Sequence, residues 1–242
     1  MPRFVMSASG FSSTVSFTVN ERKLKRSSMI DSVLQPMKQA LREALPGREY
    51  QRVASPELSY GRHFGPPPNS ASQAAVIILL QHGEDGWTIP LTKRPSTLKH
   101  HGGQICLPGG SQEPDESLAE CACRELHEEL GVQIETRDLI GQLSPIYVFA
   151  SDFAVTPFVS IRSEALDYRP NPDEVEQLIQ LPISALDSPD HAGRHEIERR
   201  GLCFRTPHVS WQQHRIWGAT HIILSELAEI WRRIRRSGRS SG

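Results

Sequence analysis

The stretch GSQEPDESLAECACRELHEELGV, residues 110–132, decides how this chain folds and where its chemistry lies. Ser117 is followed three residues later by Glu120, which is the pattern of a helix-capping box, and Gly131 is typical of a helix C-terminus. We therefore predict a helix over residues 117–130. Apolar residues recur along it at the spacing of one buried face: Leu118, Ala122, Leu126 and Leu130.

Three glutamates share one flank of this helix. Glu125, Glu128 and Glu129 are spaced i, i+3 and i+4, so their carboxylates converge and repel one another. Arg124 is the one basic residue placed to relieve the repulsion. A hard divalent cation such as Mg²⁺ or Mn²⁺ relieves it better, because it prefers oxygen ligands. The alternative is an acidic helix face that is merely solvated.

The residues around the helix favour the metal site. The spaced positions are Gly110, Glu116, Arg124-Glu125-Leu126, Glu128-Glu129 and Gly131-Val132. This pattern resembles the Nudix box, G-x5-E-x7-R-E-U-x-E-E-x-G-U with U apolar, at every defined position. The resemblance implies a pyrophosphohydrolase that acts on a nucleoside diphosphate linked to another group. It also implies an α/β Nudix fold, an α/β/α sandwich around a mixed β-sheet.

The resemblance further implies roles for individual residues. Glu128 would be a metal ligand or the general base, and Arg124 would orient a carboxylate. The bound Mg²⁺ or Mn²⁺ would neutralise the diphosphate and lower the pKa of a water molecule. The implied metal-binding residues are Glu125, Glu129, Glu128, Glu116 and Gly110, the last through its backbone in a Gly-Gly turn.

A second signature lies upstream of the box. Its segments are Leu91-Thr92-Lys93-Arg94, Leu98, His101, Gly103-Gln104-Ile105 and Pro108-Gly109-Gly110. They are similar to the signature of the coenzyme A diphosphatase branch. There are two departures: Pro95 replaces a small hydroxyl residue, and Leu107 replaces an aromatic one. The segments Val155-Thr156-Pro157, Asp173-Glu174-Val175 and Ile216-Trp217-Gly218-Ala219-Thr220 also resemble that branch.

The branch resemblance implies cleavage of coenzyme A or its thioesters to 3′,5′-ADP and 4′-phosphopantetheine or its acyl form. The residues we expect to bind this small-molecule substrate are Arg94, Lys93, His101 and Gln104, and Glu174 is a candidate catalytic base. Another nucleoside diphosphate, such as ADP-ribose, NADH or a nucleotide sugar, would use the same box. A non-catalytic module that binds a nucleotide or an RNA end remains a third alternative.

Composition narrows the class of protein. Of 242 residues, 38% are hydrophobic and 23% charged, which excludes a collagen, a disulfide scaffold and a wholly disordered chain. The 27 basic and 28 acidic residues nearly cancel, so nucleic-acid binding is not expected despite basic clusters near both ends. No apolar run is long enough to span a membrane. Four cysteines without disulfide or zinc spacing fit a reducing, cytoplasmic compartment, and family resemblance makes a homodimer plausible.

The chain divides into four expected parts. Residues 1–28 form a disordered extension, residues 29–71 an N-terminal helix and linker, residues 72–235 the Nudix domain, and residues 236–242 a disordered basic tail. The N-terminal helical pattern spans residues 30–45 and contains Pro36, so this helix is kinked or begins near Gln35. The other expected elements are strands at 74–80, 87–92, 139–143, 155–161 and 175–181 and a helix at 219–234.

Overall fold

The computed structural model describes residues 19–57, 67–83, 86–97, 102–163, 166–199 and 201–239. The α-helices there are α1 (Val19–Ala40), α2 (Arg48–Val53), α3 (Leu118–Leu130) and α4 (Gly218–Arg239). The first strands are β1 (Ser72–Gly83), β2 (Gly86–Lys93), β3 (Ile105–Cys106), β4 (Gly109–Ser111), β5 (Leu139–Gln142) and β6 (Ile146–Val148). The later strands are β7 (Phe153–Arg162), β8 (Gln177–Pro182), β9 (Ala192–Arg199), β10 (Leu202–Trp211) and β11 (His214–Trp217).

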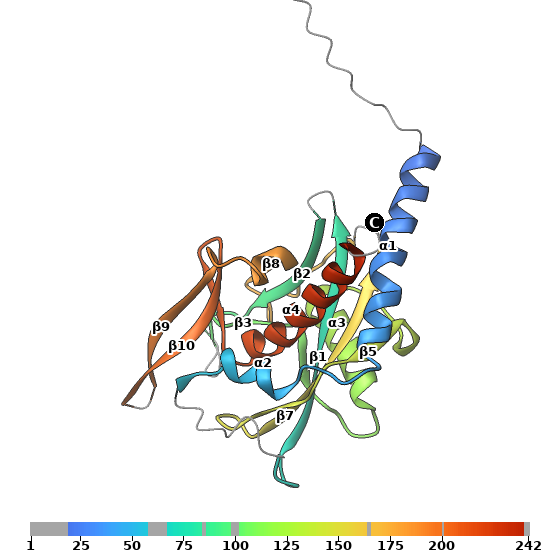
Figure 1. Ribbon diagram of the computed structural model, residues 1–242. Helices are drawn as coiled ribbons and strands as arrows, with labels where there is room; N and C mark the ends of the chain where they lie inside the picture. The colour runs from blue at the N-terminus through green and yellow to red at the C-terminus, as the bar shows by residue number, and fades with distance from the viewer. Residues whose placement is uncertain are drawn as a thin grey trace, which may run out of the picture.

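A mixed β-sheet forms the centre of the molecule (Figure 1). Its main strand order is β3-β2-β1-β7-β5, and β4, β6 and β8 pair with β1, β7 and β2. Strands β1 and β7 run parallel, whereas the other pairs are antiparallel. The long apolar run of β1 is central because its side chains are buried on both faces.

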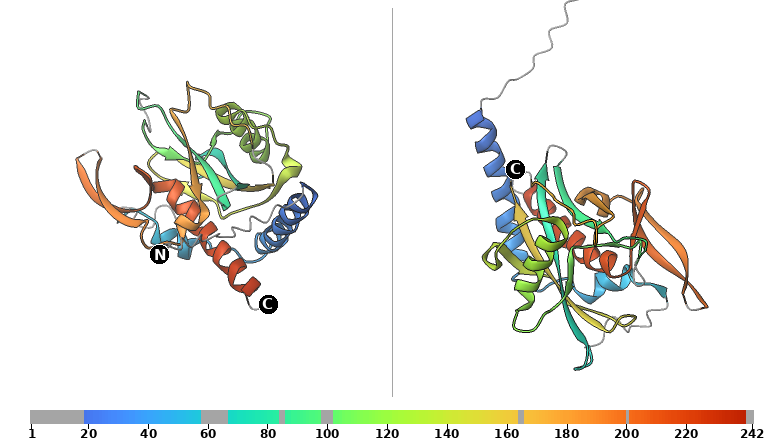
Figure 2. Two further views of the ribbon diagram at one scale, coloured as in Figure 1. Left: turned by 90° about the horizontal axis from the view of Figure 1, so that it is seen from above. Right: turned by 180° about the vertical axis from the view of Figure 1, so that it is seen from behind.

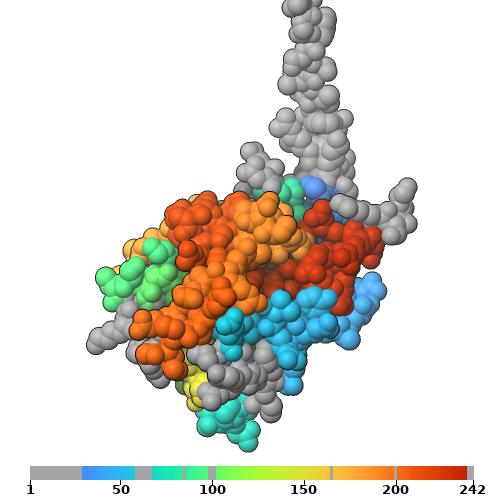
Figure 3. All heavy atoms as spheres, turned by 60° about the vertical axis from the view of Figure 1, so that its left-hand side comes forward, coloured from blue at the N-terminus to red at the C-terminus, as the bar shows by residue number. Residues whose placement is uncertain are grey.

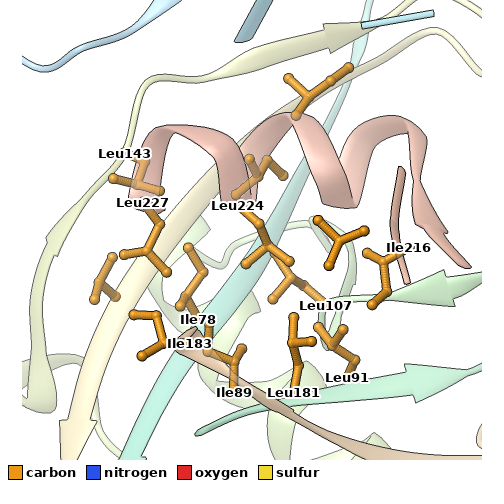
Figure 4. Close-up of a cluster of buried hydrophobic side chains, with 14 of the residues drawn as sticks. Ile78, Ile89, Leu91, Leu107, Leu143, Leu181, Ile183, Ile216, Leu224 and Leu227 are labelled. Carbon is orange, nitrogen blue, oxygen red and sulfur yellow. The ribbon is translucent and has the colours of Figure 1, made fainter. Parts of the chain in front are cut away.

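Helices cover both faces of this sheet (Figure 2). On one face α3 packs on the alternate β1 residues Ala75, Ile77 and Leu79. On the other face α4 lies over Ile78 and its neighbours, in the larger hydrophobic core (Figure 4). The sequence-based prediction of an α/β/α sandwich around a mixed sheet is therefore confirmed.

Helix α3 has the ends that the sequence predicts. The Ser117 side chain accepts a hydrogen bond from the backbone of Glu120, and the Glu120 side chain accepts one from the backbone of Ser117. Gly131 ends the helix in the left-handed conformation, with φ of 67°. Cys121 and Cys123 are buried among apolar side chains, as small hydrophobic residues.

The N-terminal segment differs from its prediction. Helix α1 runs through Pro36, so it does not begin near Gln35, and it ends at Ala40 rather than at residue 45. Leu41 turns away and lies against β5, where a Cβ on Gly141 would be 2.9 Å from the Cβ of Leu41. The four-part division stays a prediction, since residues 1–18 and 240–242 lie outside the described residues; residues 19–28 and 236–239 have helical backbone.

A second sheet was not predicted. Strands β9, β10 and β11 form an antiparallel sheet in the order β11-β10-β9, and β11 leads directly into α4. Its β9–β10 hairpin stands out from the body of the molecule, beside the segment that follows α2 (Figure 3). Within the described part of the chain, no helix has both the length and the apolar character needed to cross a membrane.

Glu226 of α4 fastens the N-terminal segment to the domain. Its side chain is fully buried. The donors to its carboxylate are uncharged amide and hydroxyl groups rather than a basic side chain. The Gly47 amide donates to Oε1 at 2.9 Å, and the Ser144 hydroxyl donates to the same oxygen at 2.7 Å. The Gln51 amide and the Ser144 backbone both donate to Oε2 at 3.2 Å. One carboxylate thus joins α4, the start of α2 and the loop between β5 and β6.

Replacing this carboxylate should destabilise the whole domain. We expect Glu226→Ala to lower the free energy of unfolding by about 3 kcal/mol or more, because it leaves several buried donors without an acceptor. Glu226→Gln keeps the shape and one acceptor oxygen, so its loss should be smaller. Urea denaturation of both variants, with exposed Glu198→Ala as control, measures the difference. A Glu226→Ala variant as stable as the control would contradict this role.

Candidate active site

The glutamates of α3 differ sharply in their surroundings. Glu129 lies on the face that packs toward the sheet, and its side chain is buried. The Glu125 side chain is 13% exposed and that of Glu128 is 46% exposed, because these positions lie progressively further around the helix axis from the buried side on which Glu129 lies. The three carboxylates therefore form a row from the protein interior to the surface.

Arg124 holds several of the carboxylates together. Its guanidinium donates to both oxygens of Glu116, at 3.0 and 2.8 Å. It also donates to Glu125 at 2.9 Å and to Glu128 at 2.8 Å. These charge-assisted bonds lower the pKa of the Glu116 carboxyl to about 2 and raise the pKa of Arg124. The arrangement matches the orienting role that the family resemblance implies for Arg124.

Glu129 lies outside this ion-pair group. The Gly109 amide donates to its Oε1 at 3.4 Å, while its Oε2 is buried and accepts no hydrogen bond from the described residues. Burial raises the pKa of the Glu129 carboxyl to about 7. Burial also raises the pKa of Glu125. A buried carboxylate oxygen without a donor is the kind of group that a cation stabilises.

The two glycines of β4 bring the backbone against these carboxylates. A Cβ on Gly110 would lie 2.3 Å from Oε1 of Glu125, and one on Gly109 would lie 2.3 Å from the carbonyl oxygen of Ala75. Strand β4 pairs with β1 through the same residues, so any larger side chain would displace either the sheet or the carboxylate. The two glycines that the sequence predicted in a turn lie instead in strand β4, where close packing leaves no room for a side chain.

This donor set fits a divalent cation by chemistry. Carboxylate oxygens predominate, and one of them is buried without a partner. Within the described residues, however, no three His, Cys, Asp or Glu side chains are gathered closely enough to hold a metal as they stand. Arg124 lies between Glu116, Glu125 and Glu128. Binding a cation would therefore require these carboxylates to shift relative to the guanidinium.

The upstream signature residues have different surroundings. Arg94 and Gln104 line a cavity of about 610 Å³ next to Gly109 and Gly110. The backbones of Arg94 and Gln104 are hydrogen bonded to each other at 3.0 Å. The Arg94 Nε is buried and donates to no described residue, and the Arg94 charge favours ionised Glu129. Arg94 therefore carries a free donor beside the carboxylates.

The structure gives less direct support for the other candidate residues, Lys93, Glu174 and His101. Lys93 forms an ion pair with Glu176, which also accepts from Ser96, and Lys93 does not line the cavity. Glu174 lies near enough to raise the pKa of Glu125 by repulsion. The prediction for His101 falls outside the described residues. These three assignments stay predictions.

Sequence reasoning missed part of the cavity wall. Leu202 and Phe204 come from β10, and Phe149 comes from the turn between β6 and β7. These residues belong to no recognised motif. The available signal was the Gly201 turn between two segments of alternating side chains, which indicates a hairpin but not its position over a cavity.

We expect Gly110→Ala to weaken cation binding with little loss of stability. The new Cβ would meet the end of the flexible Glu125 side chain, which can move aside but then leaves its place in the site. Titration with Mn²⁺, following free Mn²⁺ by electron paramagnetic resonance, should show affinity reduced about tenfold or more. Gly238→Ala, where a Cβ meets open space, is the matched control. Unchanged Mn²⁺ affinity in Gly110→Ala would exclude Glu125 as a ligand.

Comparison with known proteins gives one consistent result. The NUDIX domain family model matches residues 71–200. The uncharacterized Nudix hydrolase NudL of Photorhabdus laumondii is 33% identical over 168 residues, covering 68% of this chain and 89% of that relative. The NudL protein of Cronobacter sakazakii is 39% identical over 163 residues, covering 64% of this chain and 81% of the relative.

A solved structure is also similar, that of a MutT/nudix family protein from Enterococcus faecalis. It has a TM-score of 0.48 and 16% sequence identity, covering 80% of this chain and 76% of that one. The family model spans more than half of the chain and includes α3 with its carboxylates. Nudix hydrolases generally use divalent metal ions. The chain therefore belongs to the Nudix family and is a pyrophosphohydrolase.

Proposed function

We propose that this enzyme hydrolyses the diphosphate of coenzyme A or acyl-coenzyme A, releasing 3′,5′-ADP and 4′-phosphopantetheine or its acyl form. The observation that carries the proposal is the position of Arg94. This residue belongs to the segment that resembles the coenzyme A diphosphatase branch; it lines the cavity, and its charge favours ionised Glu129. A diphosphate next to the carboxylates would lie close to the Arg94 guanidinium.

Each charged group has a separate task in this reaction. Glu125 and Glu129 would hold Mg²⁺ or Mn²⁺, with Glu128 and Glu116 as further ligands. The bound cation would supply neutralisation of the diphosphate charge and a more acidic water. Arg124 is a positioning residue, because its contacts are to carboxylates and to the Ser111 carbonyl.

Water must lose a proton as it attacks a phosphorus atom and the bridging P–O bond breaks. We infer that the acceptor is a carboxylate oxygen of Glu128 or Glu174. Both side chains reach solvent at the edge of the site, and both lie close enough to Glu125 to influence its pKa. Glu129 is less suited to this task because it is buried against β4.

A substrate panel tests the proposal directly. With Mg²⁺ or Mn²⁺, we expect release of 3′,5′-ADP from coenzyme A to be faster than release of AMP from ADP-ribose or NADH, as read by mass spectrometry of the products. Glu129→Gln and chelation with EDTA should each abolish turnover. Faster cleavage of ADP-ribose or NADH would retain the pyrophosphohydrolase and reject coenzyme A as its substrate.

Arg94→Ala should lower kcat/KM roughly 10- to 100-fold, the effect of losing a charged hydrogen bond to a phosphate oxygen. We propose that Arg94 contacts the diphosphate, because its charge acts on Glu129, so losses on coenzyme A and dephospho-coenzyme A should be equal. Arg205→Ala, an exposed arginine of β10, is the matched control. A loss confined to coenzyme A would instead assign Arg94 to the 3′-phosphate.

A further inference from the structure

The cavity beside the carboxylates has a strongly apolar wall. Val76 and Val155 of the sheet form one side, and Ile222 and Ile223 of α4 form another. Arg94 is the one charged residue among the described residues that line it, and Gly109 and Gly110 line the same cavity. A substrate held at the carboxylates would therefore extend into an uncharged space.

Two exposed apolar side chains mark the rim of this cavity. Phe149 is 51% exposed and Leu202 is 60% exposed, although both line the cavity. They stand on separate elements, the β6–β7 turn and the β9–β10 hairpin. Exposure of large apolar groups to water is unfavourable, and covering them with an apolar ligand lowers the free energy of the system.

The polar groups of the wall suit a chain better than a purine base. The Thr220 hydroxyl already donates to the Ile105 carbonyl at 3.0 Å, and Gln104 is engaged in another interaction. A buried adenine edge needs several hydrogen-bond partners, whereas an acyl chain needs none and the pantetheine arm needs them only at its two amides and its hydroxyl. The cavity volume of about 610 Å³ is within the range of pockets that enclose small-molecule ligands.

We propose that this cavity binds the acyl-pantetheine arm of the substrate, and that Phe149 and Leu202 make the enzyme prefer long acyl chains. The inference rests on the proposed function, because it assigns the second half of the same substrate. The carboxylates and Arg94 hold the diphosphate, and the acyl chain lies between the sheet, α4 and the hairpin.

The hairpin is braced in the position that this role requires. Arg194 of β9 forms an ion pair with Glu57 at 3.4 Å, and the adjacent Pro56 lines the cavity. Trp217, at the end of β11, lines it as well and makes an edge contact with His195 of β9. The rim residue Leu202 lies on β10, the strand that pairs with β9, and β9 makes both of these contacts.

Acyl chain length provides the test. For the full-length protein with Mg²⁺, kcat/KM is measured on coenzyme A and its acetyl, hexanoyl and decanoyl thioesters. Binding of the acetyl and decanoyl thioesters is measured separately by calorimetry in EDTA, where turnover is absent. Each methylene that enters the cavity should raise kcat/KM and affinity by up to about fourfold.

The rim variants Phe149→Ser and Leu202→Ser should reduce the decanoyl-to-acetyl ratio about tenfold in both measurements. Val53→Ser is the matched control, because Val53 is 71% exposed on α2 and does not line the cavity. Its ratio should equal that of the unaltered protein. Thermal melting confirms that each variant is folded, as expected for exposed positions.

The outcomes separate the two proposals. Equal turnover of all four compounds, with equal binding of the acetyl and decanoyl thioesters, would overturn the inference and leave coenzyme A hydrolysis standing. No metal-dependent cleavage of any of them would overturn the proposed function together with this inference. A chain-length preference that neither rim variant alters would overturn the assignment of Phe149 and Leu202.

Discussion

The repulsion among the carboxylates near the start and along the flank of α3 is the constraint on which this structure depends. Glu116, Glu125 and Glu128 can stay close together because a single guanidinium, that of Arg124, donates to all of them. A lysine could not do the same, since an ammonium lacks the planar set of donors that reaches several acceptors at once. The remaining carboxylate, Glu129, is beyond this group and keeps an unpaired buried oxygen. It therefore gains most from a cation, and its burial keeps it fixed relative to β4.

Strand β4, at the edge of the sheet, determines where the carboxylate site lies. Strand β4 pairs with β1 through Gly109 and Gly110, and only residues without a side chain allow the backbone to lie this close to both β1 and Glu125. The same two residues line the cavity on the α4 side. The carboxylates of α3 and the apolar space under α4 thus lie on opposite faces of one sheet and meet at its glycine edge.

Local signals were sufficient to predict α3, its caps and the central strands, because capping residues and continuous apolar runs determine these elements within a few residues. The end of α1 could not be predicted this way. The apolar spacing continues to Leu45, but the helix ends at Ala40, where Leu41 packs against Gly141, a contact distant in sequence.

The β9–β11 sheet was missed because β9 alternates charged residues with partly exposed ones, so it carries no strong apolar pattern. The adjacent cations Lys93 and Arg94 look equivalent in sequence. Because successive side chains of an extended chain point to opposite sides, Lys93 contacts Glu176 and Arg94 lines the cavity.

The two faces of the sheet have separate tasks in this proposal. The carboxylates of α3 on one face carry out the reaction, and the cavity on the other face selects the substrate. The carboxylates that we propose as cation ligands lie on or beside a helix that is fixed by its caps, by the sheet and by Arg124, so changing one of them disturbs the whole charge group. The cavity wall is instead completed by a turn and a hairpin, elements that tolerate substitution because few buried contacts depend on them. Changes at such positions can alter the shape of the apolar space while the carboxylates remain in place. Enzymes that share the same box can therefore differ in the group attached to the diphosphate, and in the assignment that we propose the box defines the reaction while the cavity selects the substrate.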